Sequence, residues 1–533
     1  MQLPSRAPLF LLWLLLWTLP ALPAARHATS TSRSHTPAKL KRQIDALLAT
    51  PAAAQAHWGI SATTLDGRVL YANNDAQLFA PASNAKLCTT SAALALLGPG
   101  ARTTTRVLAQ GAIDASGHLQ GDLVLVGNGD ASISGRVYPY KLHTERTDQP
   151  LSALEALADQ VVRHGVRSIS GNVVGDDSAF PLERYGAGWS WDDLEWDYGA
   201  PATALTVNDN VVYLHVLPSA RAGDPVTVRW TPDVPYYTVA NTARTSVAGG
   251  QPSLDVDRQP GSLTVRLFGT LPVGGKGADL ALAIEDPAEF AAIAFRQMLT
   301  ARGVQIAGSA VARHRWPTDT EHYDAEMRVP VALPLSTPAS LSLLPSPPET
   351  GQVLATRTSV PLLEDITVTN KVSQNLHAEL FLRLLGKQYG RDASIVQGAR
   401  VVRQFLINAG VAPDDFFFYD GSGMSEQDLI TPRALTQLLR YVAAQPWGAE
   451  FRSTLPVGGV DGTLADRFAR PALRGRIFAK TGTLGEVNSL SGYVKARSGR
   501  LLVVSILCNA HRPDVEGTTK TMDAIVAAIA AAN

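Results

Sequence analysis

The sequence has little cysteine, no net charge and only one marked apolar run. Its two cysteines, Cys88 and Cys508, are too few for a disulfide scaffold or a four-thiolate zinc site. Each lies among apolar residues, which favours a small core residue, and at most one bridge between them is possible. The 47 basic and 47 acidic side chains cancel. No overall field would therefore concentrate nucleic acid or an anionic membrane surface, and we expect neither as a partner.

The marked apolar run, Leu9–Leu19, follows Arg6 and precedes several small residues. This order is typical of a secretory signal peptide, which we place at 1–25. The run is shorter than the roughly 20 residues of a membrane span. We therefore expect cleavage, and a mature protein outside the cytoplasm with no membrane span; an uncleaved anchor is the alternative. Residues 26–38 are polar and aperiodic, which predicts a flexible leader.

The motifs of common cofactors are also absent. There is no His-Glu-x-x-His and no cysteine and histidine spacing for zinc, so we expect no metallopeptidase and no metal. Residues 126–130, VGNGD, lack the full dinucleotide or phosphate-loop pattern, which favours a strand and a turn. We expect no other cofactor. The eleven histidines are scattered, and His377 is interpreted as a supporting or surface residue, not a catalytic base.

What is present is the composition of an ordinary globular protein, with 45% hydrophobic and 18% charged residues. A chain of 533 residues allows three or four domains of about 150 residues, or one large architecture with insertions. Periodicity and turn signals predict a helix at 40–48, a hairpin at 58–72 and a helix over Ala85–Leu97.

The residue pattern changes between 102 and 315, where short runs of β-forming residues such as Ser168–Val174 alternate with Gly, Asp and Pro. This spacing predicts antiparallel sheets or a small sandwich, interrupted by helices at 151–164 and 287–302. Residues 332–351 are dense in Pro and Ser, which indicates a linker or a surface crossing.

Helical patterns return at 362–385, 394–409 and 431–444, and three closely spaced strands with a final helix follow. The last of these strands, Leu501–Cys508, is apolar on both faces, as in a sheet that helices cover on both sides. The first hairpin and these three strands could form one antiparallel sheet. Residues 102–345 would then be an insertion within a single domain.

Three short polar motifs carry the candidate chemistry. Ser83-Asn84-Ala85-Lys86 lies at a helix start, where residues three apart share a face and the hydroxyl can meet the amine. Ser373-Gln374-Asn375 precedes another helical stretch, and Lys480-Thr481-Gly482-Thr483 lies in a strand whose glycine permits close approach. Each motif is weak alone, because serine is a common helix cap. Together they supply a nucleophile, a base and part of an oxyanion site.

The three motifs occur in the order Ser-x-x-Lys, Ser-x-Asn, Lys-Thr-Gly, and here the sequence resembles the penicillin-recognising serine enzymes. Neighbouring segments narrow the resemblance: FAPASN at 79–84, GDLVLVGNGD at 121–130, DGSG at 420–423 and LPVGGVDGT at 455–463. Over about 40–530 the chain is similar to the D-Ala-D-Ala carboxypeptidase/endopeptidase family of low-molecular-mass penicillin-binding proteins, peptidase S13. Ser83 and Ser373 are 290 positions apart, and this family is similar in placing two extra domains between the corresponding motifs.

The resemblance implies an α+β fold. It predicts a serine transpeptidase domain like that of penicillin-binding proteins and β-lactamases, an antiparallel five-stranded sheet flanked by helices, with two inserted, mostly β domains. The corresponding boundaries are 39–101 and 346–533 for the peptidase domain, 102–205 and 286–345 for the inserted domain, and 206–285 for the domain nested in it.

The resemblance also implies a reaction on peptidoglycan stem peptides and crosslinks. Ser83 would attack the D-Ala-D-Ala bond with Lys86 as base, and water would then release the acyl-enzyme; β-lactams would acylate the same serine. Ser373 and Asn375 would relay a proton and hold the substrate. Burial beside a second cation, Lys480, would lower the pKa of Lys86 as a base requires.

Further substrate contacts are implied in the same way. Lys480 and Thr481 would meet the terminal carboxylate beside Gly482, and backbone N–H groups of Ser83 and Thr483 would form the oxyanion hole. Asp176 and Phe180 lie in a segment that resembles the part of the family's inserted domain that approaches the diamine of the stem peptide. The alternative is that this segment is only a surface turn after a strand. The cluster Trp189, Trp191 and Trp196 is expected to pack between domains instead of binding sugars.

Two features depart from the family pattern: Gln374 stands where Asp is usual, and the segment 336–363 is longer and richer in Pro. Neither removes a catalytic atom. The setting that the resemblance and the signal peptide imply is the periplasm. Two alternative functions are a non-catalytic cell-wall-binding protein on the same fold, and a β-lactamase or esterase.

Overall fold

The computed structural model describes residues 38–142, 144–318, 322–334, 344–345, 350–513 and 515–533. The predicted signal peptide and, apart from residue 38, the predicted leader lie outside this part of the chain. So does most of the Pro- and Ser-rich segment between 335 and 349. Within the described residues, no helix combines the length and the apolar character that a membrane crossing needs.

The two ends of the described chain build one five-stranded sheet with the order β2-β1-β23-β22-β21. Every neighbouring pair is antiparallel. The strands are β1 (His57–Thr64), β2 (Val69–Asn73), β21 (Ile477–Leu484), β22 (Val487–Lys495) and β23 (Leu501–Asn509). This confirms the predicted sheet, in which β1 pairs along its whole length with a strand more than 400 residues later.

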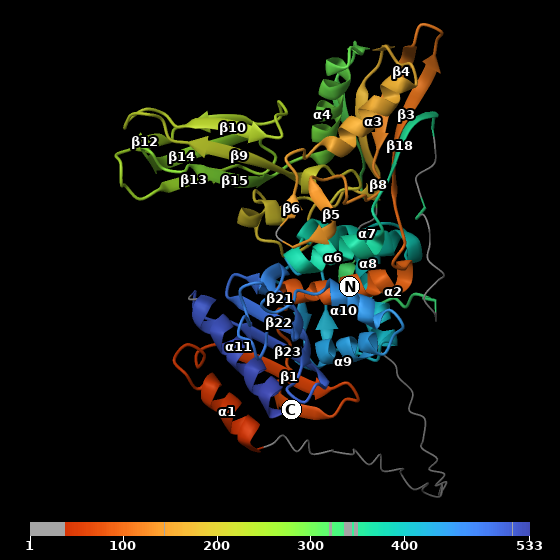
Figure 1. Cartoon of the computed structure of the whole chain (residues 1–533). Helices are drawn as coiled ribbons and strands as arrows, with labels where there is room; N and C mark the ends of the chain where they lie inside the picture. The colour runs from red at the N-terminus through yellow and green to blue at the C-terminus, as the bar shows by residue number, and fades with distance from the viewer. Residues whose placement is uncertain (1–37, 143, 319–321, 335–343, 346–349, 514) are drawn as a thin grey trace, which may run out of the picture. The chain divides into compact units, whose positions relative to one another are not determined.

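The central strand β23 shows why this sheet needs cover on both faces. Successive strand side chains point to opposite faces. Val503 and Leu507 accordingly join the apolar cluster of Leu435 on α9 (Pro432–Ala443). Ile506 and its even-numbered neighbours instead join the cluster formed with α1 (Ala38–Leu48) and α11 (Val515–Ala532). The apolar run on both faces is thus explained by helices on both sides (Figure 1).

The remaining helices near this sheet are α2 (Lys86–Leu97), α6 (Leu362–Val372), α7 (Asn375–Tyr389), α8 (Ile395–Asn408) and α10 (Gly448–Thr454). The helical pattern at 362–385 is two helices, not one. Ser373 ends α6 in the left-handed region at φ 63°, and Gln374 caps α7 by accepting from the N–H of Leu376. The break places the Ser373-Gln374-Asn375 motif at a junction between two helices.

The insertion contains a seven-stranded sheet of β16 (Gln305–Ile306), β7 (Ser168–Ile169), β4 (His118–Val126), β3 (Thr104–Ile113), β18 (Gln352–Thr358), β8 (Val173–Pro181) and β17 (Ala310–Arg315). Strand β18 lies beyond the predicted end of the insertion at 345 but pairs with β3, so the sheet of the insertion extends to Thr358. The prediction of antiparallel sheets holds only in part here. β3 pairs antiparallel with β4 and β18, whereas β4 runs parallel to β8, and β8 parallel to β17. Parallel neighbours need a long crossover. The helices α3 (Ser152–Arg163) and α4 (Pro287–Ala301) supply it. The run 168–174 is likewise two strands, β7 and β8.

Between β8 and α4 the chain forms a second β group (Figure 1). It comprises β9 (Val211–Leu217), β10 (Thr227–Thr231), β11 (Thr238–Asn241), β12 (Arg244–Ser246), β13 (Ser253–Asp257), β14 (Thr264–Pro272) and β15 (Ala278–Ala283). β10, β9 and β15 form one antiparallel sheet. β14 pairs in parallel with β11 and β12 and antiparallel with β13.

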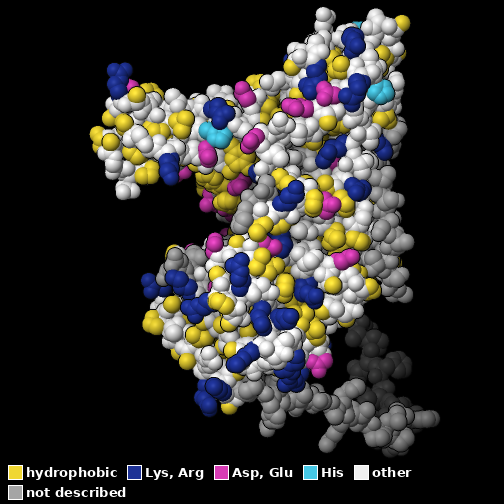
Figure 2. All heavy atoms as spheres, viewed as in Figure 1, with side chains coloured by type: hydrophobic (Ala, Val, Ile, Leu, Met, Phe, Trp, Pro, Cys, Tyr) yellow, Lys and Arg dark blue, Asp and Glu magenta, His cyan; other side chains and the backbone are white. Residues whose placement is uncertain are grey.

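Short elements complete the described chain: β5 (Arg136–Lys141), β6 (Thr144–Arg146), α5 (Tyr323–Met327), β19 (Phe416–Phe417) and β20 (Leu429–Ile430). Cys88 and Cys508 are free and buried, as expected of small core residues. On the face in Figure 2 basic side chains occur over the whole molecule and are densest over its lower part, around the five-stranded sheet.

Candidate functional site

The first motif places a serine hydroxyl against a buried amine. A short 3₁₀ turn, Ala82–Ala85, leads into α2, which begins at Lys86. This turn brings the Nζ of Lys86 to 2.8 Å from the Oγ of Ser83. Lys86 is fully buried, whereas Ser83 is partly exposed. The hydroxyl therefore has an amine on its inner side and an open side facing solvent.

The amine of Lys86 makes two further contacts. Its Nζ lies 2.6 Å from the Oδ1 of Asn375 and 2.6 Å from the carbonyl oxygen of Ser422. None of its three partners is a carboxylate. Burial lowers the pKa of Lys86 to about 7, against the opposing effect of Asp420, Glu379 and Asp428 nearby. An amine with that pKa is partly neutral at neutral pH and can accept a proton.

The second and third motifs form a matching pair. The Nζ of Lys480 on β21 donates to the Oγ of Ser373 at 2.8 Å and to the carbonyl of Thr481 at 2.8 Å. Lys480 is fully buried, and burial together with the Lys86 cation holds its pKa well below the usual range. The structure thus brings the five predicted residues together as two hydrogen-bonded sets. Lys86 contacts Ser83 and Asn375, and Lys480 contacts Ser373, two positions before Asn375.

Strand β21 passes close to the serine. A Cβ added to Gly482 would lie 2.9 Å from the backbone nitrogen of Ser83, which explains why only glycine fits there. Asn84 reinforces this approach by donating to the carbonyl of Lys480 at 3.1 Å. The hydroxyl of Thr481 lies 2.7 Å from that of Thr463, and Thr483 is exposed at the end of the strand.

Sequence reasoning missed a buried carboxylate group behind Lys86. Asp420 accepts from the backbone N–H groups of Gly423 and Ser425 at 2.7 Å each, and Glu379 accepts from that of Gly421 at 3.0 Å. These bonds hold the loop that presents the Ser422 carbonyl to Lys86. Burial, with Asp420 adding to it, raises the pKa of Glu379 to about 8.

Asp428 completes this group. It accepts from the N–H of Tyr419 at 2.7 Å, and burial followed by Asp420 raises its pKa well above the usual range. The segment DGSG at 420–423 supports the family resemblance and could have indicated these carboxylates, but the sequence alone predicts no role for it. The fold places this segment beside Lys86, and this position shows its role.

Asp176 and Phe180 do not join this centre by any hydrogen bond described. Asp176 lies on β8 with 7% exposure, and its carboxylate is 3.2 Å from Arg313 of β17. Phe180 is 1% exposed and belongs to the apolar core. This placement corrects the expected role of Phe180, because a ring with so little surface packs within the core and leaves no room for a substrate contact.

The tryptophan cluster divides among three environments. Trp189 donates from Nε1 to Asp420 at 2.9 Å, and Trp196 packs against the apolar core of the insertion. Trp191 is 73% exposed, so the packing prediction is wrong for this residue. The same segment reaches the second motif as well, since the carbonyl of Tyr198 accepts from the Nδ2 of Asn375 at 2.8 Å.

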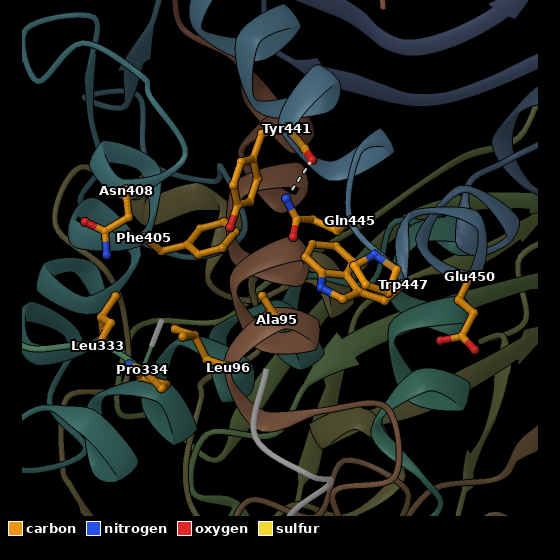
Figure 3. A pocket seen from close by; sticks show the side chains of 11 residues that line it. Ala95, Leu96, Leu333, Pro334, Phe405, Asn408, Tyr441, Gln445, Trp447 and Glu450 are labelled. Carbon is orange, nitrogen blue, oxygen red and sulfur yellow. Dashed lines mark hydrogen bonds between the residues drawn. The ribbon is translucent and has the colours of Figure 1, made fainter. Parts of the chain in front are cut away.

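Other candidate sites are weaker. Among the described residues, no three or more His, Cys, Asp or Glu side chains are placed to hold a metal ion. A cavity of about 870 Å³ lies between the rings of Phe405, Tyr441 and Trp447, where the Gln445 amide donates to the carbonyl of Tyr441 (Figure 3). Its lining offers no nucleophile with a base beside it, in contrast to the Ser83 centre.

The sequence matches known carboxypeptidases, which agrees with a site built around a serine and a lysine. Residues 40–324 and 336–531 match the D-Ala-D-Ala carboxypeptidase 3 (S13) family. The chain is 31% identical over 510 residues to a D-alanyl-D-alanine carboxypeptidase of Actinomadura sp., covering 93% of this chain and 86% of that protein. It is 25% identical over 453 residues to D-alanyl-D-alanine carboxypeptidase DacB of Haemophilus influenzae, covering 84% of each.

Solved structures share the fold. Penicillin binding protein 4 from Haemophilus influenzae superposes with a TM-score of 0.74 at 23% identity, covering 91% of this chain and 97% of that one. The same protein in complex with a β-lactam gives a TM-score of 0.69 at 22% identity, covering 92% and 99%.

Proposed function

The chain belongs to the D-Ala-D-Ala carboxypeptidase 3 (S13) family, and on this basis we propose that it is a serine-type D-Ala-D-Ala carboxypeptidase and endopeptidase of peptidoglycan. The observation that carries the proposal is the 2.8 Å contact between the Ser83 hydroxyl and the Lys86 amine. A buried amine with a pKa of about 7 is suited to accept the serine proton.

Acylation follows from this pair. As the Oγ of Ser83 bonds to the carbonyl carbon of the penultimate D-Ala, its proton passes to the Nζ of Lys86. The carbon–nitrogen bond then breaks, the leaving amine takes up a proton, and the terminal residue departs. Backbone N–H groups of Ser83 and Thr483 would stabilise the oxyanion, a contribution of about 3 to 4 kcal/mol per donor in serine hydrolases.

The second motif supports the leaving group. The Oγ of Ser373 accepts from Lys480, so the hydroxyl proton of Ser373 is free to point toward the leaving amine. Asn375 accepts from Lys86 through Oδ1 and donates one Nδ2 proton to the carbonyl of Tyr198. Its other Nδ2 proton is available for the substrate amide. These residues would carry the proton relay and the substrate contact.

The terminal carboxylate of the substrate would lie along β21. Lys480, Thr481 and the exposed Thr483 line this strand around Gly482, close to Ser83. A β-lactam places a carboxylate beside a strained amide, so it would occupy the same groups and acylate the serine. Asp176 stays a candidate for the stem-peptide diamine through its carboxylate, which Arg313 now partners.

Release of the acyl group needs a water molecule that attacks the ester carbon, with the proton of the water passing to Lys86 or Ser373. The product is a stem peptide shortened by one D-Ala, or an opened crosslink when the leaving amine belongs to a neighbouring peptide. We place this activity in the periplasm, on the support of the predicted signal peptide and the bacterial cell-wall enzymes that the chain resembles.

The test is intact-mass spectrometry of the mature protein after brief exposure to benzylpenicillin. We expect a stable mass increase of one penicillin in the wild type and none in Ser83→Ala. Ser91→Ala is the matched control, because Ser91 lies on the same helix and its hydroxyl bonds only to backbone carbonyls of that helix. This variant should keep the adduct.

Two outcomes would overturn the proposal. Intact penicillin with no adduct on the wild type would favour a non-catalytic cell-wall-binding protein. Rapid turnover of penicillin would favour a β-lactamase. A stable adduct leads to the second step, the release of D-Ala from stem peptides compared with cleavage of crosslinked muropeptides.

A further inference from the structure

We propose that Asp209 and Gln374 act as a positioning pair, through which a turn of the insertion holds the Ser373-Gln374-Asn375 loop in its reactive conformation. This inference rests on the proposed function, because its effect is measured on acylation of Ser83. It gives a role to Gln374, the central residue of the second motif.

The contact itself is direct. The Nε2 of Gln374 donates to the Oδ2 of Asp209 at 3.1 Å. The Oε1 of Gln374 accepts from the N–H of Leu376 at 2.8 Å, which caps α7. One amide therefore ties the start of α7 to a carboxylate that is 165 positions earlier in the chain. On either side of this amide lie Ser373 and Asn375, whose side chains contact the two lysines.

The turn that carries Asp209 is held in a costly conformation. Asn208, Asp209 and Asn210 have φ values of 51°, 58° and 56°, three successive residues in the left-handed region without a glycine. Each such residue costs on the order of 1 kcal/mol or more, and persists only where surrounding contacts demand it.

Side-chain bonds supply those contacts. Asn208 donates to the carbonyl of Val211 at 2.7 Å, and Asn210 donates to that of Pro201 at 2.8 Å. Arg146 donates to the Oδ1 of Asn208 at 3.1 Å. The turn is therefore rigid enough to aim a carboxylate out of the insertion and toward the second motif.

The charges around Asp209 select an uncharged partner at position 374. The carboxylate already accepts from Arg136 and Arg146 at 2.6 Å each, and from His377 of α7 at 3.2 Å. Asp365 holds the other ring nitrogen of this histidine at 2.6 Å. Asp209 is 1% exposed. It therefore stays ionised among these three cations, and still accepts the Gln374 amide.

An acidic residue at 374 would change this balance. Two carboxylates would then face each other where the 3.1 Å bond now lies, because the Nε2 donor would be lost. One of them would have to turn away, toward Arg136 or Arg146, or take up a proton. Either change shifts the loop that carries Ser373 and Asn375. The amide at Gln374 is thus the chemistry that Asp209 requires, and the two residues form a matched pair across the insertion boundary.

The experiment is a double-variant cycle read as the rate constant of acylation by benzylpenicillin. Gln374→Glu keeps the shape but places a second carboxylate beside Asp209, and we expect acylation to slow by about tenfold or more. Asp209→Asn should slow it as well, because Arg136 and Arg146 lose this carboxylate and His377 loses one of its two. The double variant Gln374→Glu/Asp209→Asn restores the net charge and an amide-to-carboxylate bond. It should recover to within about fivefold of the wild type.

Gln397→Glu is the matched control. Gln397 is 1% exposed, and its amide donates to a carboxylate, that of Glu326, at 2.8 Å. It has the same chemistry as Gln374 but lies on α8 and has no contact with the motif loop. This variant should lower the unfolding temperature and leave the acylation rate constant of the folded protein unchanged. A general effect of buried charge would instead slow both Glu variants.

Wild-type acylation measured in parallel separates the two proposals. No adduct on the wild type refutes the proposed function, whereas a wild-type adduct with an unchanged rate in Gln374→Glu refutes only the pair. A folded double variant that is no faster than the slower single variant also refutes it. If Gln374→Glu fails to fold, Gln374→Ala removes the donor without adding charge; a wild-type rate in this variant would overturn the inference.

Discussion

Two buried polar clusters flank the second motif: the first is Lys86 with its hydrogen-bond acceptors, and the second is His377 with Asp365 and Asp209. The pKa of the basic side chain is shifted in opposite directions in the two clusters. Lys86 and His377 are both fully buried. Lys86 touches a hydroxyl, an amide oxygen and a backbone carbonyl, and burial lowers its pKa to about 7. Burial acts on His377 in the same direction, yet Asp365 and Asp209 outweigh it and raise its pKa to about 9.

The difference shows that burial alone does not decide the charge of a side chain. A carboxylate in direct contact keeps the buried cation charged, and neutral acceptors allow it to lose its proton. The first arrangement suits a cluster that holds a loop in place. The second suits a base, because a permanently charged amine could not accept the serine proton.

The largest effect should come from deleting the cation of the first cluster. Lys86→Met removes the base, and we expect acylation by benzylpenicillin to slow by roughly 10²- to 10⁴-fold. Thermal unfolding checks that the variant folds, because loss of the amine leaves the buried acceptors of Asn375 and Ser422 without this donor. A near-normal rate in a folded Lys86→Met protein would exclude this residue as the base.

A carboxylate introduced beside Lys86 should make the first cluster resemble the second. In Asn375→Asp the new carboxylate would replace the amide oxygen that lies 2.6 Å from Nζ. The pKa of Lys86 should rise, and the acid limb of the pH–rate profile should move up by about 1 to 3 pH units. Asn375→Ala is the control: it loses the substrate contact without adding charge, so its rate should fall with no such shift. An unmoved limb in Asn375→Asp would contradict the comparison.

Opposite pKa shifts should give opposite dependences of stability on pH. Between about 7 and 10.5 the unfolded chain binds the Lys86 proton more tightly than the native protein, so this residue makes stability rise with pH. Between 6.5 and about 9 the native protein binds the His377 proton more tightly. The stability from His377 is complete below 6.5 and lost as pH rises through about 9.

Each slope can reach about 1.4 kcal/mol per pH unit. Urea unfolding at several pH values would separate them: Lys86→Met should remove the rising contribution and His377→Gln the falling one. Slopes of the same sign, or slopes that neither substitution alters, would show that the two clusters do not differ in the stated way.

The smallest effect should come from an acid whose neutral form is favoured by burial. Burial, followed by the neighbouring Asp420, raises the pKa of Asp428 well above its usual range. Asp428→Asn therefore changes shape and charge little, and acylation should change by less than about threefold, with the same pH profile. A displaced acid limb in this variant would show that Asp428 is ionised and acts on Lys86.

Much of the fold followed from local patterns. The hairpin at 58–72, the strands near the C-terminus and the helix after Ser83 were predicted from periodicity and turn residues, and the five-stranded sheet was expected from them. The mixed sheet of the insertion was not. Strand direction depends on how α3 and α4 cross over it, and a strand has the same residue pattern in both directions.

The active site, like the fold, could be predicted only where neighbouring residues determine it. The pairing of Ser83 with Lys86 could be predicted, since one helical turn joins them. Phe180 could not be placed correctly, because an aromatic residue in a strand has the same local pattern whether it faces the core or a cleft. The buried carboxylates and Asp209 have no short-range pattern of their own, since each acts on groups far away in the chain.

The sequence by itself determined the family, the order of the three motifs and the contacts made within one turn of a helix, since these depend on neighbouring residues. Only the tertiary structure decided which charges lie together in the interior. A pKa depends on every dipole and ion within a few ångströms, and the groups that set those of Lys86 and His377 come from segments as distant as 209 and 428. The left-handed turn at Asn208–Asn210 also depends on tertiary structure, because Arg146 donates to Asn208 from 62 positions away, a bond that exists only once the insertion has folded.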